Sequence, residues 1–374
     1  MSTVVLMAGG TGGHLFPAMA LAQELGRRGH AIHLVTDERV AGYGDSFPAR
    51  EVHVVPSATP SVRDPVKLAR AVARLGWGTM VAWGTLGGIR ADVMVGFGGY
   101  PTVPPFLAGR LRGVPGILHD SNAVLGRANL LLARYANALA LSFENTRRAE
   151  PFAAKIVITG NPVRDRVRAV ADRPFPPLKP GEPVRLLVVG GSQGARAFAD
   201  LVPPAIALLP ADLRSLLLVT QQCRREDLDR VAEAYRQAKV SVELQAFFTD
   251  LPERMADSHL VISRSGASTV TELCVIGRPA ILVPLPGAID ADQKNNALVL
   301  DRAGGGWIAE QASLTPQVLA DRLAGLLAAP AQLSAAAAIA KSLGRPDAVA
   351  LLADLAEKLA AGRSRAAKRL GEPA

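Results

Sequence analysis

The stretch "VVLMAGGTGGHLFPAMALAQEL", residues 4–25, decides the fold class because it joins a strand pattern to a helix pattern through a glycine loop. Its first four residues form a continuous apolar run, which is typical of a strand buried on both faces. Pro17 suits the first turn of a helix, and apolar residues then recur at helical spacing. The glycines let a ligand approach the backbone, and the N–H groups of the helix start favour an anion, most often phosphate. A plain strand-to-helix turn is the alternative.

The loop lacks the spacing of the common nucleotide-binding motifs. "GGTGGH" does not have the G-x-G-x-x-G spacing of dinucleotide-binding proteins, and the chain contains no G-x-x-x-x-G-K-[ST] phosphate loop. Nicotinamide and ATP-type functions are therefore disfavoured.

Composition indicates a globular protein of two domains. The chain has 374 residues, of which 49% are hydrophobic, enough for sizeable cores and too many for a disordered chain. Two cysteines, Cys223 and Cys274, predict neither a disulfide scaffold nor a metal site, which favours a reducing, cytoplasmic compartment. We expect no secretory signal and no membrane-spanning helix.

The charge of the chain predicts an anionic partner. Its formal net charge of +9 favours nucleic acid, an anionic membrane or a phosphorylated substrate. Aromatic residues make up only 5% and no basic-aromatic platform occurs, so we predict no nucleic-acid partner. A GC-rich genome, which favours arginine and alanine, is an alternative source of the charge.

Short apolar runs alternate with helical patterns along the chain, which predicts an α/β fold with doubly wound parallel sheets. A strand, a glycine loop and a helix recur in "VRLLVVGGSQGARAFADLV", residues 184–202, so we expect two such halves. Five prolines in residues 172–183 indicate a linker or domain boundary between them. In open α/β sheets ligands bind at the carboxyl ends of the strands.

The second half carries two further loops that begin helices. In "SRSGASTVTEL", residues 263–273, hydroxyls and free N–H groups make a second candidate phosphate site. Glu272 lies one turn further, where its carboxylate could bind ribose hydroxyls or simply complement the helix dipole. In "DQKNNA", residues 292–297, the acid and amide groups suit sugar hydroxyls, and helix-start polarity explains them as well.

Seven segments together resemble, in order and spacing, the MurG family of N-acetylglucosaminyltransferases, glycosyltransferase family 28, over about residues 3–355. They are "GGTGGHLFPAMALA", "GFGGYPTVP", "LHDSNAVLGRANLLLA", "GNPVR", "VVGGSQGA", "SRSGASTVTEL" and "DQKNNA". The resemblance implies the GT-B fold, two facing Rossmann-like doubly wound domains with an interdomain cleft. It assigns residues 1–163 to the acceptor and membrane side and residues 164–340 to the UDP-sugar donor. A helix at about 341–360 is expected to pack back on the first domain.

The resemblance also implies an activity. The family inverts the anomeric centre as it moves N-acetylglucosamine from UDP-N-acetylglucosamine to the 4-hydroxyl of the muramoyl sugar of lipid I, a polyprenyl diphosphate. The product is lipid II of peptidoglycan synthesis, and the enzyme lies as a peripheral protein on the cytoplasmic face of the cell membrane. Alternatives are a glycolipid synthase, a UDP-N-acetylglucosamine 2-epimerase and a non-catalytic nucleotide-sugar-binding membrane module.

Donor contacts carried over by the resemblance come from both halves of the chain. They are Thr11, Gly12, Gly13, Asn122, Arg164, Ser192, Phe248, Gly266, Ala267, Ser268, Thr269, Val270, Thr271, Glu272 and Gln293. Among them, the backbone of Phe248 is implied to bind uracil, Glu272 the ribose and Gln293 the sugar hydroxyls. The chain has "HDSN" at residues 119–122 where the family usually has "HEQN", so the role of that acid does not transfer directly.

An inverting transfer needs a base for the acceptor hydroxyl and stabilisation of the leaving diphosphate. His14, at the mouth of the first loop, is a candidate base or a positioning group, and Asp120 is the rival base. We expect His119 to be structural, and Tyr100 to be either an acceptor contact or a packed aromatic. No ligand cluster is evident from the spacing, so no metal and no cofactor are predicted, and helix N-termini with Arg164 replace the metal.

Residues 66–90 combine tryptophans with basic residues. Trp77 and Trp83 alternate with apolar positions at near-helical spacing, and Lys67, Arg70 and Arg74 are interspersed. This pattern predicts an interfacial helix on an anionic membrane surface, and an ordinary helix packed on a sheet is the alternative.

Overall fold

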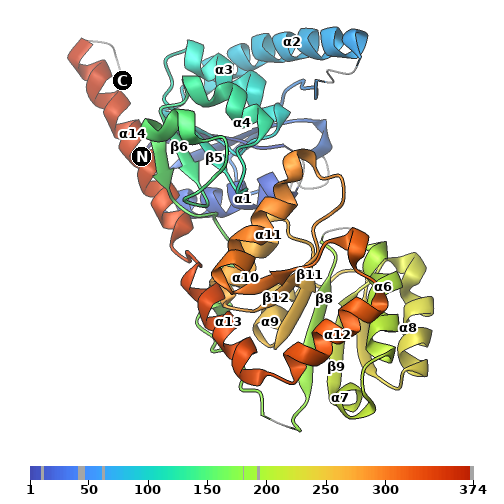
Figure 1. Ribbon diagram of the computed structural model, residues 1–374. Coiled ribbons are helices and arrows are strands. Elements are labelled where there is room, and N and C mark those ends of the chain that lie inside the picture. The colour runs from blue at the N-terminus through green and yellow to red at the C-terminus, as the bar shows by residue number, and fades with distance from the viewer. Residues whose placement is uncertain (10–11, 41–46, 61–63, 180, 192–193, 371–374) are drawn as a thin grey trace. The chain divides into compact units, whose positions relative to one another are not determined.

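The computed structural model describes residues 1–9, 12–40, 47–60, 64–179, 181–191 and 194–370. The chain divides into two compact units (Figure 1). The first unit is Met1–Arg164 with Pro346–Ala374, and the second unit is Asp165–Arg345.

The described strands are β1 (Thr3–Met7), β2 (Ala31–Thr36), β3 (Glu51–Val54), β4 (Val93–Gly96), β5 (Gly116–Asp120), β6 (Ala138–Leu141), β7 (Ile156–Ile158), β8 (Val184–Val189), β9 (Leu217–Gln222), β10 (Ser241–Gln245), β11 (Leu260–Ser263), β12 (Ala280–Leu282) and β13 (Gly306–Ile308). The described α-helices are α1 (Gly12–Arg27), α2 (Pro65–Ile89), α3 (Val103–Leu111), α4 (Arg127–Leu132), α5 (Asp165–Ala171), α6 (Arg196–Ala207), α7 (Ala211–Ser215), α8 (Leu228–Gln237), α9 (Leu251–Ala256), α10 (Ala267–Ile276), α11 (Asp292–Ala303), α12 (Pro316–Leu327), α13 (Pro330–Ser342) and α14 (Ala348–Leu370).

A parallel sheet forms the centre of the first unit. In the described part of the chain it has seven strands in the order β3-β2-β1-β4-β5-β6-β7. Side chains of β1 alternate between two cores: Val4 and Leu6 pack under α1 and α14, whereas Val5 and Met7 pack under α2, α3 and α4. Burial on both faces explains the continuous apolar run of β1.

The second unit repeats this arrangement. Its sheet has six described strands, all parallel, in the order β10-β9-β8-β11-β12-β13. The largest core of this unit packs Phe198 of α6, Tyr235 of α8 and Leu323 of α12 against β8 and its neighbours. Both sheets have the strand order of a Rossmann fold, which confirms the predicted α/β fold of doubly wound sheets.

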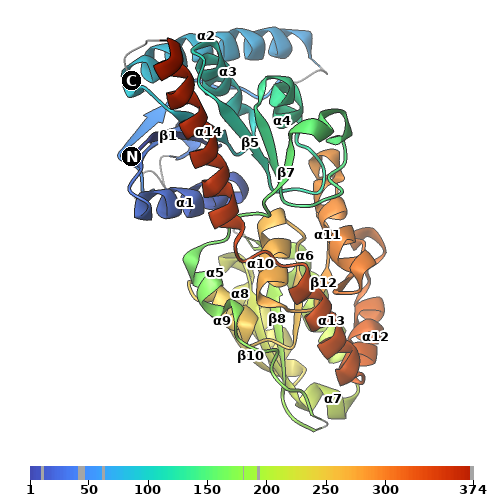
Figure 2. The ribbon, with the colours of Figure 1, turned by 90° about the vertical axis from the view of Figure 1, so that its left-hand side faces the viewer.

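The last described helix belongs to the first unit. Leu352 and Ala356 of α14 pack in the core beneath α1 (Figure 2). Arg28 bonds Asp354 at 2.6 Å and Glu357 at 2.9 Å, which ties α14 to the end of α1. The helix expected at about 341–360 instead begins at Ala348, after α13 has ended in the second unit.

Pro17 does not lie where the sequence predicted it. Helix α1 already begins at Gly12, so Pro17 lies inside the helix and not in its first turn. Its ring removes the N–H that would otherwise bond the carbonyl of Gly13.

The proline-rich segment at residues 172–183 is not the linker that its composition predicted. It falls inside the second unit, and Phe175 and Leu178 pack against that unit's core. Arg278 holds the segment by donating to the Pro174 carbonyl at 2.9 Å while its guanidinium lies 5.7 Å from the Phe175 ring. The unit boundary is instead at Arg164.

Among the described residues, no single helix combines the length and the apolar composition needed to cross a membrane. Helices α12 and α13 reach that length and composition only as a pair, with a bend of 92° between them.

Candidate active site

In the first unit, candidate residues meet where the strand order reverses, between β1 and β4. His14 lies in the first turn of α1, which follows β1, and Gly98 and Gly99 follow β4. Both glycines have positive φ, +87° and +74°, which favours glycine. A Cβ at either position would come within 3.4 to 3.5 Å of the His14 ring, so bare backbone lies beside this half-buried imidazole.

Asp120, the last residue of β5, is held by a set of donors. One carboxylate oxygen accepts from the backbone N–H of Asn122 at 3.1 Å. The other accepts from the Gly126 N–H at 2.8 Å and from Asn129 Nδ2 at 2.9 Å. The carboxylate therefore organises the "HDSN" loop and the start of α4.

Burial governs the protonation of these side chains. It raises the pKa of Asp120, while the hydrogen bonds and the nearby His14 oppose the shift. Burial lowers the pKa of His119 to about 4, and Nε2 of that ring bonds the Gly160 carbonyl at 3.1 Å. His119 is thus a neutral, fully buried side chain at neutral pH. His14 acts electrostatically on both residues, which places it beside them.

Six other predicted residues belong to the first unit. The Arg164 guanidinium lies 4.9 Å from the Phe16 ring, which brings it to the start of α1 near His14. Asn122 is half-buried in the loop that Asp120 organises, and Tyr100 packs partly against the core beneath α3. Gly12 and Gly13 open α1, whereas Thr11 lies outside the described residues.

In the second unit, the candidate phosphate site is the start of α10, which follows β11 at the corresponding reversal of strand order. Gly266 is the N-cap in extended conformation. Ser263, Ser265 and Ser268 each have a buried hydroxyl that meets no hydrogen-bond partner among the described residues. Buried hydroxyls are normally paired, so three unsatisfied ones at one helix start indicate a site for a polar ligand.

The remaining residues of this segment differ in what they can offer. Ala267 and Val270 are buried, so only their backbone can meet a ligand. Thr269 is half-buried, and the Thr271 hydroxyl donates to the Ala267 carbonyl at 2.8 Å. Glu272 is buried in the second turn of α10, which is unusual for a carboxylate.

Phe248 lies in the loop after β10, and Gln293 lies in the first turn of α11. Phe248 is buried with the Arg254 guanidinium 4.5 Å from its ring. The Gln293 side-chain oxygen accepts from the Leu285 N–H at 2.9 Å, which fixes the loop after β12. Asn296 donates to the Ser265 carbonyl at 3.2 Å and so links α11 to the α10 loop. Ser192 lies outside the described residues.

Sequence reasoning missed the role of Asn129, and it did not show that two hydroxyls of the predicted phosphate site lack hydrogen-bond partners among the described residues. Asn129 positions Asp120, and its own side-chain oxygen is buried without a hydrogen-bond partner in the described chain. The unsatisfied hydroxyls of Ser263 and Ser265 become evident only when the burial of the loop is known. The polar run "SRS" ending an apolar strand was the available signal for the second feature.

Comparison with known proteins places the chain in a family. Residues 4–141 match the glycosyltransferase family 28 N-terminal domain, and residues 185–352 match the glycosyltransferase family 28 C-terminal domain. A relative from Allorhizobium ampelinum is 49% identical to this chain over 96% of both chains. It is named UDP-N-acetylglucosamine--N-acetylmuramyl-(pentapeptide) pyrophosphoryl-undecaprenol N-acetylglucosamine transferase. Its namesake in Mesorhizobium japonicum is 50% identical, again over 96% of both.

Solved structures agree with this assignment. MurG of Acinetobacter baumannii superimposes with a TM-score of 0.79 at 29% identity, covering 96% of this chain and 100% of that one. The UDP-GlcNAc 2-epimerase of Neisseria meningitidis, at 14% identity and a TM-score of 0.63, covers 94% and 98% and shares the fold alone. The chain therefore belongs to the MurG family of glycosyltransferase family 28 and has the GT-B fold.

Proposed function

We propose that this protein transfers N-acetylglucosamine from UDP-N-acetylglucosamine to the 4-hydroxyl of the muramoyl sugar of lipid I, which gives lipid II. The observation that carries this function is the 49% identity, over 96% of both chains, to relatives named for that transfer. No cofactor takes part in the proposed reaction.

The second unit would bind the donor. The N-terminus of α10, with the buried hydroxyls of Ser263, Ser265 and Ser268, suits the diphosphate, because backbone N–H groups there face a negative charge. Glu272 would accept bonds from the ribose hydroxyls. As the glycosidic bond breaks, these donors would stabilise the charge that develops on the departing UDP.

The first unit would supply the base. Asp120 already accepts three hydrogen bonds. This suits a carboxylate that holds its loop in place and provides a negative charge beside His14. His14 is half-buried beside bare glycine backbone, where an acceptor sugar can approach it. We assign proton removal from the acceptor hydroxyl to His14 and the positioning of that imidazole to Asp120.

These two roles make different kinetic predictions. His14→Ala should lower kcat about 10²- to 10⁴-fold with little change in donor binding, because general-base catalysis contributes that much. Asp120→Asn removes the charge and leaves one acceptor oxygen in place of two, but it keeps His14, so it should lower kcat less than His14→Ala and shift the pH profile of kcat. Equal losses of kcat from both variants with unchanged pH profiles would contradict the assignment.

The overall function is tested by transfer of radiolabelled sugar from UDP-N-acetylglucosamine to a lipid I analogue. We expect a labelled lipid product that depends on the acceptor. Formation of UDP-N-acetylmannosamine without acceptor would instead show an epimerase. Donor binding without consumption in the presence of lipid I would show a binding module.

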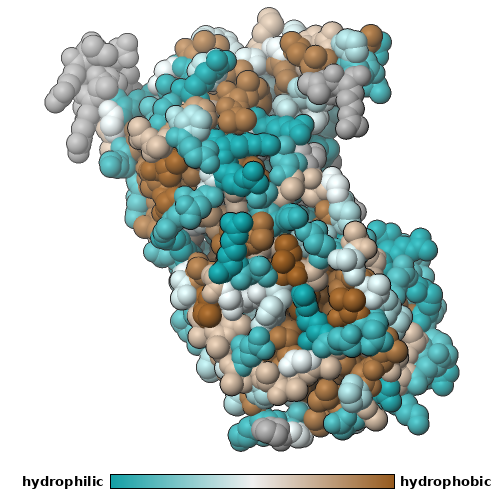
Figure 3. Space-filling view, in the orientation of Figure 1, coloured by the Kyte–Doolittle hydropathy of each residue, from teal (hydrophilic) through white to brown (hydrophobic). Residues whose placement is uncertain are grey.

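We also propose that the protein docks on an anionic membrane surface through α2. In this 25-residue helix the buried residues are Ala71, Gly78, Ala82 and Leu86, which form one stripe packed toward α3. Other large apolar side chains of α2 are exposed: Val66, Val72, Trp77, Met80 and Trp83. Figure 3 shows hydrophobic and hydrophilic surface mixed along the edge where Figure 1 places α2. This surface suits an interfacial helix.

A further inference from the structure

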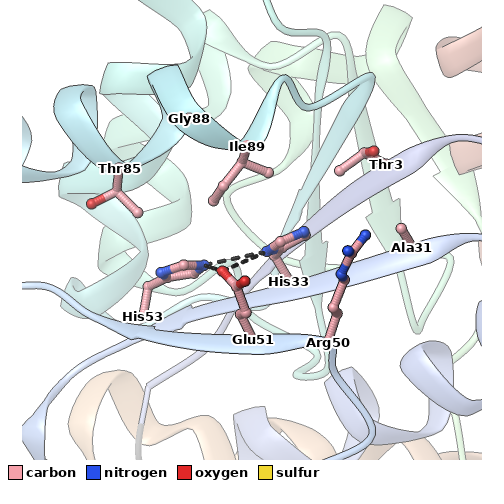
Figure 4. A pocket seen from close by; sticks show the side chains of 9 residues that line it. All are labelled: Thr3, Ala31, His33, Arg50, Glu51, His53, Thr85, Gly88 and Ile89. Atoms are coloured by element: carbon pink, nitrogen blue, oxygen red, sulfur yellow. Dashed lines mark hydrogen bonds and ion pairs between the residues drawn. The ribbon is translucent and has the colours of Figure 1, made fainter.

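A second group of ionisable side chains lies near the amino ends of the strands of the first unit. His33 is on β2, and Glu51 and His53 are on β3. The parallel register pairs His33 with Glu51 and Val35 with His53, so the three side chains project from one face of the sheet. Figure 4 shows them pointing toward one another in a cavity of about 580 Å³ that Thr85, Gly88 and Ile89 of α2 help to line.

The three atoms that face one another are spaced like the ligands of one ion. His33 Nδ1 lies 3.2 Å from His53 Nε2 and 3.8 Å from a Glu51 carboxylate oxygen. The His53 Nε2 atom lies 3.4 Å from that same oxygen. In a tetrahedral zinc site with bonds of 2.0–2.2 Å, neighbouring ligand atoms are roughly 3.3–3.6 Å apart. A shift of a few tenths of an ångström would therefore seat a metal ion.

The protonation and charge of the group suit a cation. The hydrogen bond between His33 Nδ1 and His53 Nε2 places the two nitrogen lone pairs at the point where an ion would bind. The Glu51 carboxylate supplies a negative charge, and Arg50 lies on the side of His33 away from His53 (Figure 4). On metal binding, the proton shared between His33 and His53 moves to the outer nitrogen of its own ring, so none need be released.

We propose that His33, Glu51 and His53 form a binding site for a divalent transition metal ion of the zinc class, with a fourth position open to water. Two imidazoles and one carboxylate are a ligand set for zinc, whereas Mg²⁺ and Ca²⁺ prefer oxygen ligands alone. The ion would join β3 to β2. Strand β3 has four residues, lies at the edge of the sheet and buries none of its side chains fully, so it gains most from such a link.

This site is separate from the proposed transfer chemistry. Thr3 and Ala31, the first residues of β1 and β2, line the cavity, whereas Asp120 ends β5 and His14 lies on the helix that follows the carboxyl end of β1. The ion would therefore stabilise the fold of the first unit and take no part in sugar transfer.

The proposal is tested on the full-length protein, freed of metal, by calorimetric titration with ZnCl₂ and by the visible absorption of Co²⁺. We expect one equivalent per chain and an intense tetrahedral cobalt spectrum. His53→Gln and Glu51→Gln should each weaken zinc binding more than about 10-fold, because even the loss of an outer-sphere partner costs 10- to 100-fold. Both residues are partly exposed, so the variants should fold, which circular dichroism checks.

His30→Gln is the matched control. It removes an imidazole that pairs with Glu357 at 2.8 Å in the same unit but that belongs to no group of three candidate ligands among the described residues. This variant should bind zinc like the parent. Absence of a bound equivalent at micromolar zinc, or equal affinity of the parent and His53→Gln, would overturn the site and leave a histidine–histidine hydrogen bond alone.

Discussion

At the scale of single residues, Glu272 is the most informative member of the donor site. It is a buried carboxylate in the second turn of α10, the helix that follows the loop of Ser263 and Ser265. Losing its charge-assisted bonds to ribose should cost roughly 1.5–3 kcal/mol of donor binding. Glu272→Gln, which keeps the volume, and Glu272→Ala should therefore raise the donor Kd by about 10-fold or more and leave acceptor binding unchanged.

Isothermal titration with UDP-N-acetylglucosamine measures the effect. Glu233→Ala, which removes an exposed carboxylate from α8 of the same unit, is the control and should bind donor like the parent. If both Glu272 variants bind donor as the parent does, the carboxylate only complements the helix dipole.

His119 predicts a pH dependence of stability. Its pKa is about 4 in the folded protein against about 6.5 when unfolded, so the unfolded chain binds more protons between these values. The contribution of neutral, buried His119 to the free energy of unfolding is therefore fully present above about pH 6.5. This contribution, about 3 kcal/mol at most, is lost as the pH falls toward 4. Urea unfolding at several pH values should show a shallower slope for His119→Gln, and equal slopes would contradict a buried neutral histidine.

At the scale of elements, the basic side chains of α2 predict salt-sensitive membrane binding. Lys67 lies 3.5 Å from Asp64, and Arg74 lies 3.2 Å from Glu38, both at the surface. Surface ion pairs of this kind contribute little to stability. Each cation near an anionic surface is worth about 1 kcal/mol and is screened by salt. Changing Lys67, Arg70 and Arg74 together to Glu should abolish sedimentation with anionic vesicles at low salt.

The matched control changes Arg225, Lys239 and Arg302, exposed cations of the second unit, to Glu. It alters the net charge equally and should still sediment with vesicles. Donor binding should survive in both variants. Equal sedimentation of the α2 variant and the parent would place the docking surface elsewhere.

The elements also show how far sequence reasoning reaches. Strands β2, β4, β5, β9, β11 and β12 follow from apolar runs, because burial on both faces leaves a continuous pattern. Strand β3 does not, because Glu51 and His53 alternate with valines on an exposed edge. The cluster at His33 was missed for the same reason, since its members come from two strands whose pairing no local pattern specifies. The prolines at 172–183 led to the wrong prediction of a linker, because local composition does not show that Phe175 packs against a core.

At the scale of the whole molecule, each unit keeps its proposed chemistry at the carboxyl ends of its strands. The repeated strand–loop–helix pattern was enough to predict this, because the reversal of strand order places the two leading loops of each sheet side by side. The hydrogen-bond network around Asp120 could not be predicted, because Asn129 and Gly126 reach it only after α4 has folded against β5.

The proposed donor site of the second unit and the proposed metal site of the first unit predict different responses to chelation. The donor diphosphate would meet the N–H groups at the start of α10, so excess EDTA should leave the rate of sugar transfer unchanged. The proposed ion lies near the amino ends of β1 and β2, so the same treatment should lower the Tm of the metal-loaded protein, because a ligand that binds only the folded state stabilises it. In His53→Gln the rate should match the parent, and EDTA should no longer change the Tm. Loss of transfer in EDTA that one divalent ion restores, in the parent and in His53→Gln alike, would show that the reaction uses a metal at another site.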